Sequence, residues 1–218
     1  MSQKISQQPL AARFNHLLKV ISSPRFLEMR GLNNDLPFYI CEFKAAEAFE
    51  MQRTQRQLIS QLRNTHVDCL QGRGVRVLDI NLYDLSIGLL QAREGGAEGI
   101  SLWDDILRLE PEIGKDRLLE LLQNVLDIKE HLIPAIAQHL AQTDYDVLFL
   151  SGIGEVFPYI RSHNVLNNLQ SVVTGKPMLM FFPGRYEQSD TLGSSLVLFG
   201  RLKDDQYYRA KNILEQEA

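Results

Sequence analysis

Five short apolar runs that alternate with helical segments constrain the fold of this chain more than any other feature. The run at residues 145–151 is almost continuously apolar, as strands buried on both faces of a parallel sheet are. Strands separated by helices favour an α/β fold, because the connecting helices cover the faces of the sheet. We therefore expect a three-layer α/β fold with a mostly parallel, five-stranded sheet and helices on both faces. The expected strands are residues 37–43, 75–82, 145–151, 177–182 and 195–202.

The segments between these runs have helical periodicity or a helix-forming composition. Pro134 lies inside the longest of them, so we expect a kink or two abutting helices there. The expected helices are residues 45–62, 83–92, 101–109, 115–141 and 156–172. An amphipathic helix at 6–22 precedes them all. We divide the chain into an N-terminal helical segment, 1–33, and a single α/β domain, 34–218.

The composition excludes several classes of protein. A net charge of −4 argues against a strongly basic nucleic-acid clamp. Two isolated cysteines, Cys41 and Cys69, form neither a disulfide framework nor a zinc site. No stretch reaches 18 apolar residues, and the first residues lack the apolar core of a signal peptide. We expect a cytoplasmic protein that does not contact a membrane.

The turn after the third expected strand is the best-placed candidate for a ligand site. Ser151, Gly152 and Gly154 follow a buried strand and precede a helix, where ligands collect in open α/β sheets. His163 lies just beyond this turn, and we include it as a fourth candidate ligand-binding residue. The alternative is that the glycines simply make a tight turn. Glu155 would add negative charge beside any anion.

Motifs for nucleotide hydrolysis are missing. Residues 43–48, after the first expected strand, contain no glycine, so they cannot form a phosphate-binding loop. The third strand ends in Ser151-Gly152 and not in the carboxylates that would hold Mg²⁺. A degenerate, non-hydrolysing relative of a nucleotide-binding fold remains open.

No other catalytic, metal or cofactor site is predicted. No two of the five histidines have the spacing that places ligands on one helix face. A nucleophile elbow is absent as well. Asp79 lies in the middle of an expected strand, where a carboxylate is unusual, and is a second-rank candidate for a site. We expect no catalytic residue, no metal and no cofactor.

The C-terminal part of the chain predicts a docking surface. Pro183-Gly184 is typical of a type II turn, after which Arg185 and Tyr186 would project from the sheet. The expected strands on either side of this polar connection lack a crossover helix and could pair antiparallel at an edge. Tyr207, Tyr208 and Arg209 are of the residue types enriched at binding hot spots. Alternatively, these aromatic side chains only cover the edge of the sheet.

Three segments resemble the BrxB family of BREX anti-phage defence systems, and the overall order of elements fits that family along essentially the whole chain. The segments are residues 150–158, 181–186 and 198–210, which include Ser-Gly-Ile-Gly-Glu, Phe-Phe-Pro-Gly-Arg-Tyr and Leu-Phe-Gly-Arg-Leu followed by Tyr-Tyr-Arg-Ala. The resemblance implies a BREX component that works with other BREX proteins, such as an ATPase, a DNA methyltransferase and the phosphatase-like protein PglZ. It carries over no catalytic residue.

Three hypotheses about function follow. The first is a non-enzymatic adaptor that docks onto another BREX component, with PglZ as the expected partner and an indirect association with DNA through the complex. The second is a nucleotide-sensing module without hydrolysis. The third is a weak nucleic-acid binder that uses Arg53, Arg56 and Arg63, although Glu47 and Glu50 flank these side chains.

Overall fold

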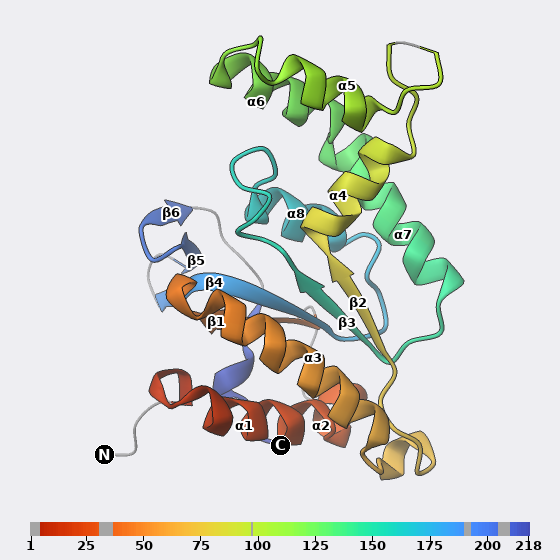
Figure 1. The fold of residues 1–218 in the computed structure, drawn as a ribbon. Helices are drawn as coiled ribbons and strands as arrows, with labels where there is room; N and C mark the ends of the chain where they lie inside the picture. The colour runs from red at the N-terminus through yellow and green to blue at the C-terminus, as the bar shows by residue number, and fades with distance from the viewer. Residues whose placement is uncertain (1–4, 31–36, 97, 190–192, 205–209) are drawn as a thin grey trace.

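The computed structural model describes residues 5–30, 37–96, 98–189, 193–204 and 210–218, and it shows an α/β protein (Figure 1). The strands are β1 (Phe38–Phe43), β2 (Val77–Asn81), β3 (Val147–Ser151), β4 (Met178–Ser189), β5 (Gly193–Leu198), β6 (Leu202–Asp204) and β7 (Lys211–Asn212). The α-helices are α1 (Leu10–Ile21), α2 (Pro24–Leu27), α3 (Ala48–Asn64), α4 (Leu82–Gln91), α5 (Leu102–Leu109), α6 (Lys115–Val125), α7 (Ile133–Gln142) and α8 (Ser162–Leu169). Short helical turns are η1 (Ile5–Gln7), η2 (Ala45–Glu47), η3 (Asp68–Leu70), η4 (Ile128–Leu132) and η5 (Ile213–Glu215).

The strands form one mixed sheet, and the predicted α/β class is confirmed. Strands β2, β3, β4, β1 and β7 lie side by side in that order, and each neighbouring pair is parallel. Strand β5 pairs antiparallel with β4, and β6 pairs antiparallel with β5. The antiparallel pairing considered for the last two predicted strands occurs, but beyond the predicted end of the fourth strand: residues 178–183 pair only with parallel neighbours, and residues 184–189 pair with β5. The expected count of five strands is wrong, because the described residues form seven.

Alternation along the central strands gives the sheet two apolar faces. Phe149 and Phe181 point to the face covered by α1 and α3, and their rings meet edge to face at 5.2 Å. Leu148 and Met180 point to the opposite face, where they join the cluster that includes residues of α4, α7 and α8. Burial on both faces explains why β3 and the first half of β4 are continuously apolar.

The first long helix packs into the same cluster as the sheet. Leu17, Val20 and Ile21 of α1 are almost completely buried beside residues of α3. Arg13 of α1 donates a hydrogen bond to Glu47 of η2 over 2.8 Å, and both side chains are largely shielded from water. The predicted boundary near residue 33 falls outside the described residues and stays a prediction.

Strand β4 does not end where the sequence predicts. The Pro183-Gly184 pair was expected to turn the chain, yet β4 continues through it to Ser189. Phe43 pairs with Pro183 at the end of the parallel ladder, and Gly184 pairs with Leu198 at the start of the antiparallel one. A Cβ atom at Gly184 would overlap the carbonyl oxygen of Val197, so glycine is what allows the close approach of β5. The turn prediction is therefore wrong, because tertiary pairing overrides the local Pro-Gly signal.

Three other expected elements are divided or shortened. The run at 195–202 is split into β5 and β6 by a turn at Phe199-Gly200, where both residues have positive φ. The segment at 115–141 is divided into α6, the π-helical turn η4 and α7, with Pro134 in the first turn of α7. Helix α8 begins only at Ser162, because the chain makes a series of turns between Gly152 and Arg161.

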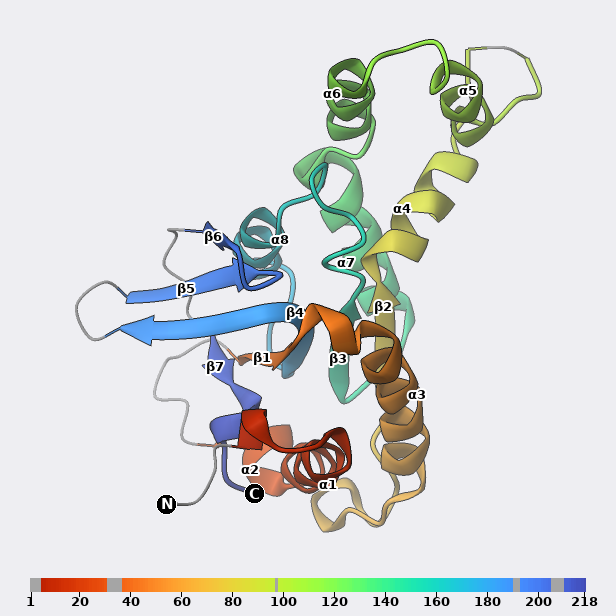
Figure 2. The same ribbon diagram turned by 60° about the vertical axis from the view of Figure 1, so that its left-hand side comes forward.

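Helices α5 and α6 lie at one end of the molecule, beyond α4 and away from the sheet (Figures 1 and 2). Ser101 caps α5 by accepting a hydrogen bond from the N–H of Asp104. We call these two helices the α5–α6 hairpin.

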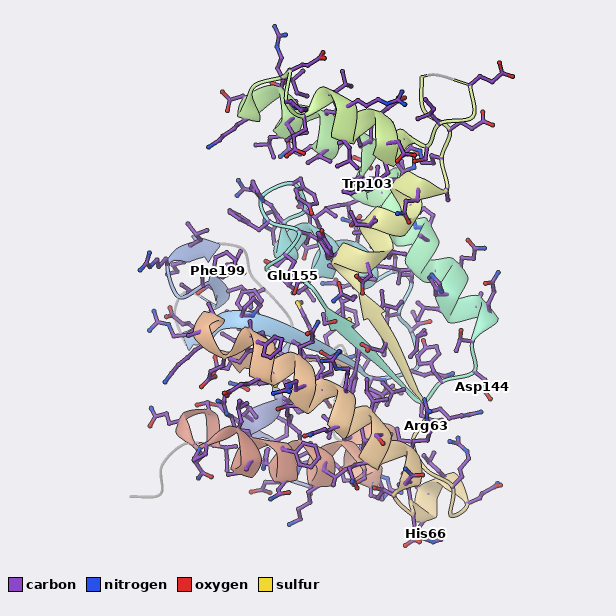
Figure 3. All side chains as sticks on the ribbon, viewed as in Figure 1. Arg63, His66, Trp103, Asp144, Glu155 and Phe199 are labelled. Atoms are coloured by element: carbon purple, nitrogen blue, oxygen red, sulfur yellow. The ribbon has the colours of Figure 1, made fainter. Side chains whose placement is uncertain are left out.

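Asp146 connects the loop that precedes β2 with the loop that precedes β3 through hydrogen bonds. It accepts hydrogen bonds from the guanidinium groups of Arg73 and Arg76 and, over 2.8 Å, from the backbone N–H of Arg76. Arg76 also pairs with Asp144, which Figure 3 labels at this corner. Burial alone would raise the pKa of Asp146, but the hydrogen bonds from Arg73 and Arg76 hold that pKa well below its ordinary value of 3.8.

We expect Asp146→Asn to lower the free energy of unfolding at pH 7 by about 1–2 kcal/mol, since both arginines remain partly solvated. The folded pKa of Asp146 is depressed, so its contribution is complete above the unfolded value near 3.8 and is lost as pH falls below it. Urea titrations at pH 7 and pH 3 measure the difference between the two proteins. A difference that does not shrink at pH 3 would contradict the assignment.

Candidate functional site

A pocket of about 200 Å³ opens at the carboxyl edge of the sheet. It lies between the start of α3, the ends of β1, β2 and β3, and the turn that follows β3. The described residues that line it are Phe43, Ala45, Ala48, Met51, Gln52, Gln55, Asn81, Ser151, Gly152, Ile153, Gly154, Glu155, Phe181, Pro183 and Phe199. We call this hollow the carboxyl-edge pocket.

The turn after β3 is shaped by its two glycines. Gly152 has a φ of +76°, which L-residues rarely adopt, and a Cβ atom there would overlap Asn81 Oδ1. That oxygen accepts hydrogen bonds from the backbone N–H groups of Tyr83 and Asp84 and so caps α4. The turn after β3 and the cap of α4 therefore lie in close contact, and only glycine at position 152 leaves room for the Asn81 side chain.

Phe199 covers one side of the pocket from the turn between β5 and β6. Its ring lies against Gly154, where a Cβ atom would come within 2.8 Å of ring atom Cε1, and it meets the ring of Phe157 edge to face at 6.2 Å. Figure 3 shows Phe199 and Glu155 near each other above the sheet. Phe199 has a φ of +55°, an uncommon conformation for a bulky residue. These contacts hold the ring in place and compensate for the strained backbone.

The lining of the carboxyl-edge pocket is unsuited to phosphate. Glu155 is its one charged residue, and neither Lys nor Arg is among the described lining residues. Burial raises the pKa of Glu155 above its ordinary value, with a smaller contribution in the same direction from Asp84. A carboxylate without a neighbouring cation repels an anion, whereas a phosphate-binding lysine attracts one.

The start of α3 also departs from a phosphate-binding loop. Lys44 is exposed, and its backbone N–H donates to Glu47 Oε2 over 3.2 Å. Glu47 thus places a carboxylate near the helix N-terminus that would otherwise face an anion. Burial alone would raise the pKa of Glu47, but the hydrogen bond from Arg13 lowers it on balance. The carboxylate stays ionised at neutral pH.

The structure brings three of the four predicted ligand-binding residues together. Ser151, Gly152 and Gly154 all line the carboxyl-edge pocket. His163 lies on α8 and is not among the lining residues. Sequence reasoning missed Gln55, Asn81 and Phe199, which reach the pocket from three other segments. The hydrophobic periodicities of strands and helices do not indicate which residues from distant segments meet in the folded chain.

Asp79, the second-rank candidate, lies beside this pocket on edge strand β2. Its Oδ1 accepts a hydrogen bond from Gln55 Nε2 over 2.7 Å, and Gln55 is itself buried. Solvent reaches Asp79, but the surrounding protein displaces enough water to raise its pKa, while the bond from Gln55 acts in the opposite direction. We interpret Asp79 as the anchor that orients Gln55 at the pocket wall.

The predicted partner-binding residues have different surroundings. The side chain of Arg185 is 64% exposed and lies 3.5 Å from Glu187. Tyr186 is buried, and its hydroxyl donates to the carbonyl of Ala210 over 2.6 Å, so it supports β4 and offers little surface to a partner. Tyr207, Tyr208 and Arg209 lie outside the described residues.

Two exposed apolar side chains extend the surface near the pocket. Phe199 is 37% exposed and Leu202 is 45% exposed, and both belong to the β5–β6 hairpin. The strand register places Leu202 opposite Leu198, whereas Arg185 pairs with Val197 on the other face of these strands. We call the exposed parts of Arg185, Phe199 and Leu202 the extension surface; it includes both faces of these strands, so a partner that contacts Arg185 and Leu202 together reaches around them.

The described residues contain neither a cluster of metal-binding side chains nor a helix that could span a membrane. Nowhere among them do three or more His, Cys, Asp or Glu side chains gather in a way that could hold a metal ion. Within the same residues, every helix is too short or too polar to cross a membrane.

Comparisons with known proteins agree with one another. A sequence model for the family described as BREX protein BrxB matches residues 78–213. The BREX protein BrxB of Bacillus cereus (strain H3081.97) is 32% identical over 211 residues, which cover 94% of this chain and 97% of that protein. The BREX protein BrxB of Escherichia coli O9:H4 (strain HS) is 25% identical over 205 residues, which cover 94% and 92%. No solved structure gives a significant match.

We expect Gly152→Ala to lower the free energy of unfolding by about 2–4 kcal/mol, because the new methyl group meets Asn81 in addition to straining the backbone. Gly175→Ala is the matched control: its φ is +74°, but no atom lies within 4 Å of the added Cβ. That control isolates the backbone cost, about 1–2 kcal/mol. Denaturant titrations measure both variants, and equal losses would show that the contact with Asn81 is unimportant.

Proposed function

Because the chain belongs to the BrxB family of BREX proteins, we propose that it serves bacterial phage defence as a non-enzymatic adaptor, docking onto another component of the system. The PglZ-like protein is the partner that we propose first. We place the assembly in the cytoplasm, and we attribute any association with DNA to the complex as a whole.

The chemistry of the carboxyl-edge pocket supports the non-enzymatic part of this proposal. In an open α/β sheet the reactive groups gather at this edge. Here the described lining contains Ser151 but no histidine or lysine, and no hydrogen bond joins the Ser151 hydroxyl to Glu155, the one carboxyl group in that lining. The remaining polar groups are amides and Glu155. Such a set can hydrogen-bond to a neighbouring molecule, but it lacks an activated nucleophile.

The extension surface carries the docking part of the proposal. Leu202 and Phe199 stay exposed although they adjoin a well-packed core, and Arg185 stands free of the core on the opposite face of the same strands. Aromatic and Arg side chains such as Phe199 and Arg185 are residue types enriched at protein interfaces, and Leu202 adds exposed apolar area beside them. The pairing of β4 with β5 holds them in place before a partner arrives.

A nucleotide-sensing module is the second candidate. The position of the carboxyl-edge pocket, between β1, β3 and the start of α3, supports it, because nucleotides bind at such edges. The absence of glycine from residues 43–48 and of a cation from the described lining argues against it.

A weak nucleic-acid binder is the third candidate. Arg53, Arg56 and Arg63 lie exposed on α3, and the guanidinium of Arg53 lies 5.3 Å from the centre of the Phe49 ring. Glu50 on the same helix adds negative charge beside them. These observations favour the adaptor.

We expect the protein to co-purify with the PglZ-like protein when both are expressed with the other BREX components. Leu202→Ala and Arg185→Ala should each reduce recovery of the partner by about tenfold, the loss typical of an interface anchor. Leu109→Ala is a control of similar exposure, 41%, on the distant α5–α6 hairpin. Quantitative mass spectrometry of the purified complex provides the measurement.

Two results would contradict this proposal. Recovery of no BREX component with the unmodified protein would exclude a stable adaptor. Loss of the partner with Leu109→Ala, but with neither Leu202→Ala nor Arg185→Ala, would show that the extension surface is not the docking site.

We further expect Mg²⁺ and ATP to leave the melting temperature of the protein unchanged. A ligand present at 100 times its Kd stabilises the native state by about 2.7 kcal/mol, which would raise the melting temperature of a chain of this size by roughly 5–10 °C. Differential scanning fluorimetry with ATP, ADP and free Mg²⁺ checks this expectation. A saturable rise with nucleotide would instead favour the sensing module.

A further inference from the structure

A second hollow, of about 190 Å³, lies between α4 and the α5–α6 hairpin. Its walls are mostly apolar and include Tyr83, Ile87, Trp103, Leu107, Leu118 and Leu122. Figure 3 shows Trp103 at the junction of α5 and α4. We call this hollow the α4–α6 groove. In Figure 2, strands β5 and β6 lie on the other side of α8 from α4 and α5, so this groove is separate from the extension surface.

The apolar side chains around this groove are only partly covered. Leu118, Leu121 and Leu122 of α6 pack against the core cluster, but none of them is fully buried. In α5 only Ile106 is buried, and Leu107 is 45% exposed. Tyr83 of α4, which also lines the groove, is 40% exposed. Since a helix in a globular protein normally buries its apolar stripe against a neighbour, Leu107 and Tyr83 leave apolar surface at the groove for such a neighbour.

The charge around the groove indicates what kind of neighbour would fit. Residues 82–127 contain ten Asp or Glu and four Lys or Arg, a net charge of −6, whereas the whole chain carries −4. One of these acidic residues, Glu110, lines the groove, and it is the one charged residue among the described residues that do. A second copy of this chain bound through the same face would bring two such acidic surfaces together, which like-charge repulsion opposes.

We propose that the α4–α6 groove binds an amphipathic helix of a partner protein, with apolar side chains in the groove and Lys or Arg side chains along its flanks. Two or three large apolar side chains spaced at i, i+3 or i+4, and i+7 match a groove between helices. The basic flanks match Glu110 and the net negative charge of residues 82–127 and give a faster, salt-dependent association. This docking site is additional to the extension surface and does not depend on the identity of the partner proposed above.

Trp103 makes the proposal directly measurable, because it is the only tryptophan in the chain and it lines the groove. The probe is a designed peptide of about 18 residues with Leu at the apolar positions of a helix and Lys elsewhere, free of aromatic residues. We expect a saturable change in Trp103 emission on titration of the full-length protein. Added salt should weaken the binding.

Matched variants identify the surface. Leu107→Ala should weaken binding of the peptide about fivefold or more, since it removes an apolar contact in the groove. Leu109→Ala should stay within about twofold of the unmodified protein, because Leu109 has nearly the same exposure, 41%, and lies on the same helix but outside the groove. Glu110→Gln should weaken binding and reduce its salt dependence. Circular dichroism confirms that each variant is folded.

Three results would overturn the proposal. The first is no saturable change in Trp103 emission, and the second is equal affinity of Leu107→Ala and the unmodified protein. The third is equal binding of a peptide with Glu in place of every Lys, which would show that the acidic surface does not select its partner. Because the titration contains no BREX partner, its failure would leave the co-purification result untouched, and the reverse also holds.

Discussion

Strand β4 is the constraint on which the rest of the structure depends. It pairs with β3 and β1 in the parallel body and, beyond Pro183, with β5 in the antiparallel extension. Pro183 has no N–H to donate, so the ladder with β1 can end there without an unsatisfied amide. Gly184 then lets the backbone of β5 approach. One continuous strand thus fixes the position of the β5–β6 hairpin relative to the core, and with it the position of Phe199 over Gly154.

The change of partner along β4 also determines the character of the carboxyl edge. In many α/β proteins that edge is open to solvent and holds a charged ligand. Here Phe199 covers it from one side, Glu155 is the one charge among the described lining residues, and Glu47 stands near the start of α3. The two carboxylates make the pocket poor for phosphate, and Phe199 gives it an apolar rim. For these two reasons we favour contact with another protein over binding of a nucleotide.

Local patterns in the sequence predicted the α/β class and a turn at Ser151, Gly152 and Gly154, which the structure places at the pocket; the family was predicted from the resemblance of three segments. They succeeded where the signal is short-range: a buried run followed by glycine is a strand and a turn in most contexts. They failed at Pro183-Gly184, where the pairing of β4 with β5 overrides a turn signal, and at Phe199, whose positive φ no propensity scale favours. Gln55 and Asn81 reach the pocket from α3 and β2, and only the tertiary structure brings them there.

The ion pair between Arg13 and Glu47 has a mechanical consequence. Arg13 is 4% exposed, and Glu47 belongs to the turn that leads into the wall of the carboxyl-edge pocket. A molecule that grips the outer side of α1 and shifts it would have to move Glu47 or leave a charge unpaired, at a cost of several kcal/mol. Through this pair, the position of α1 and the wall of the carboxyl-edge pocket are coupled.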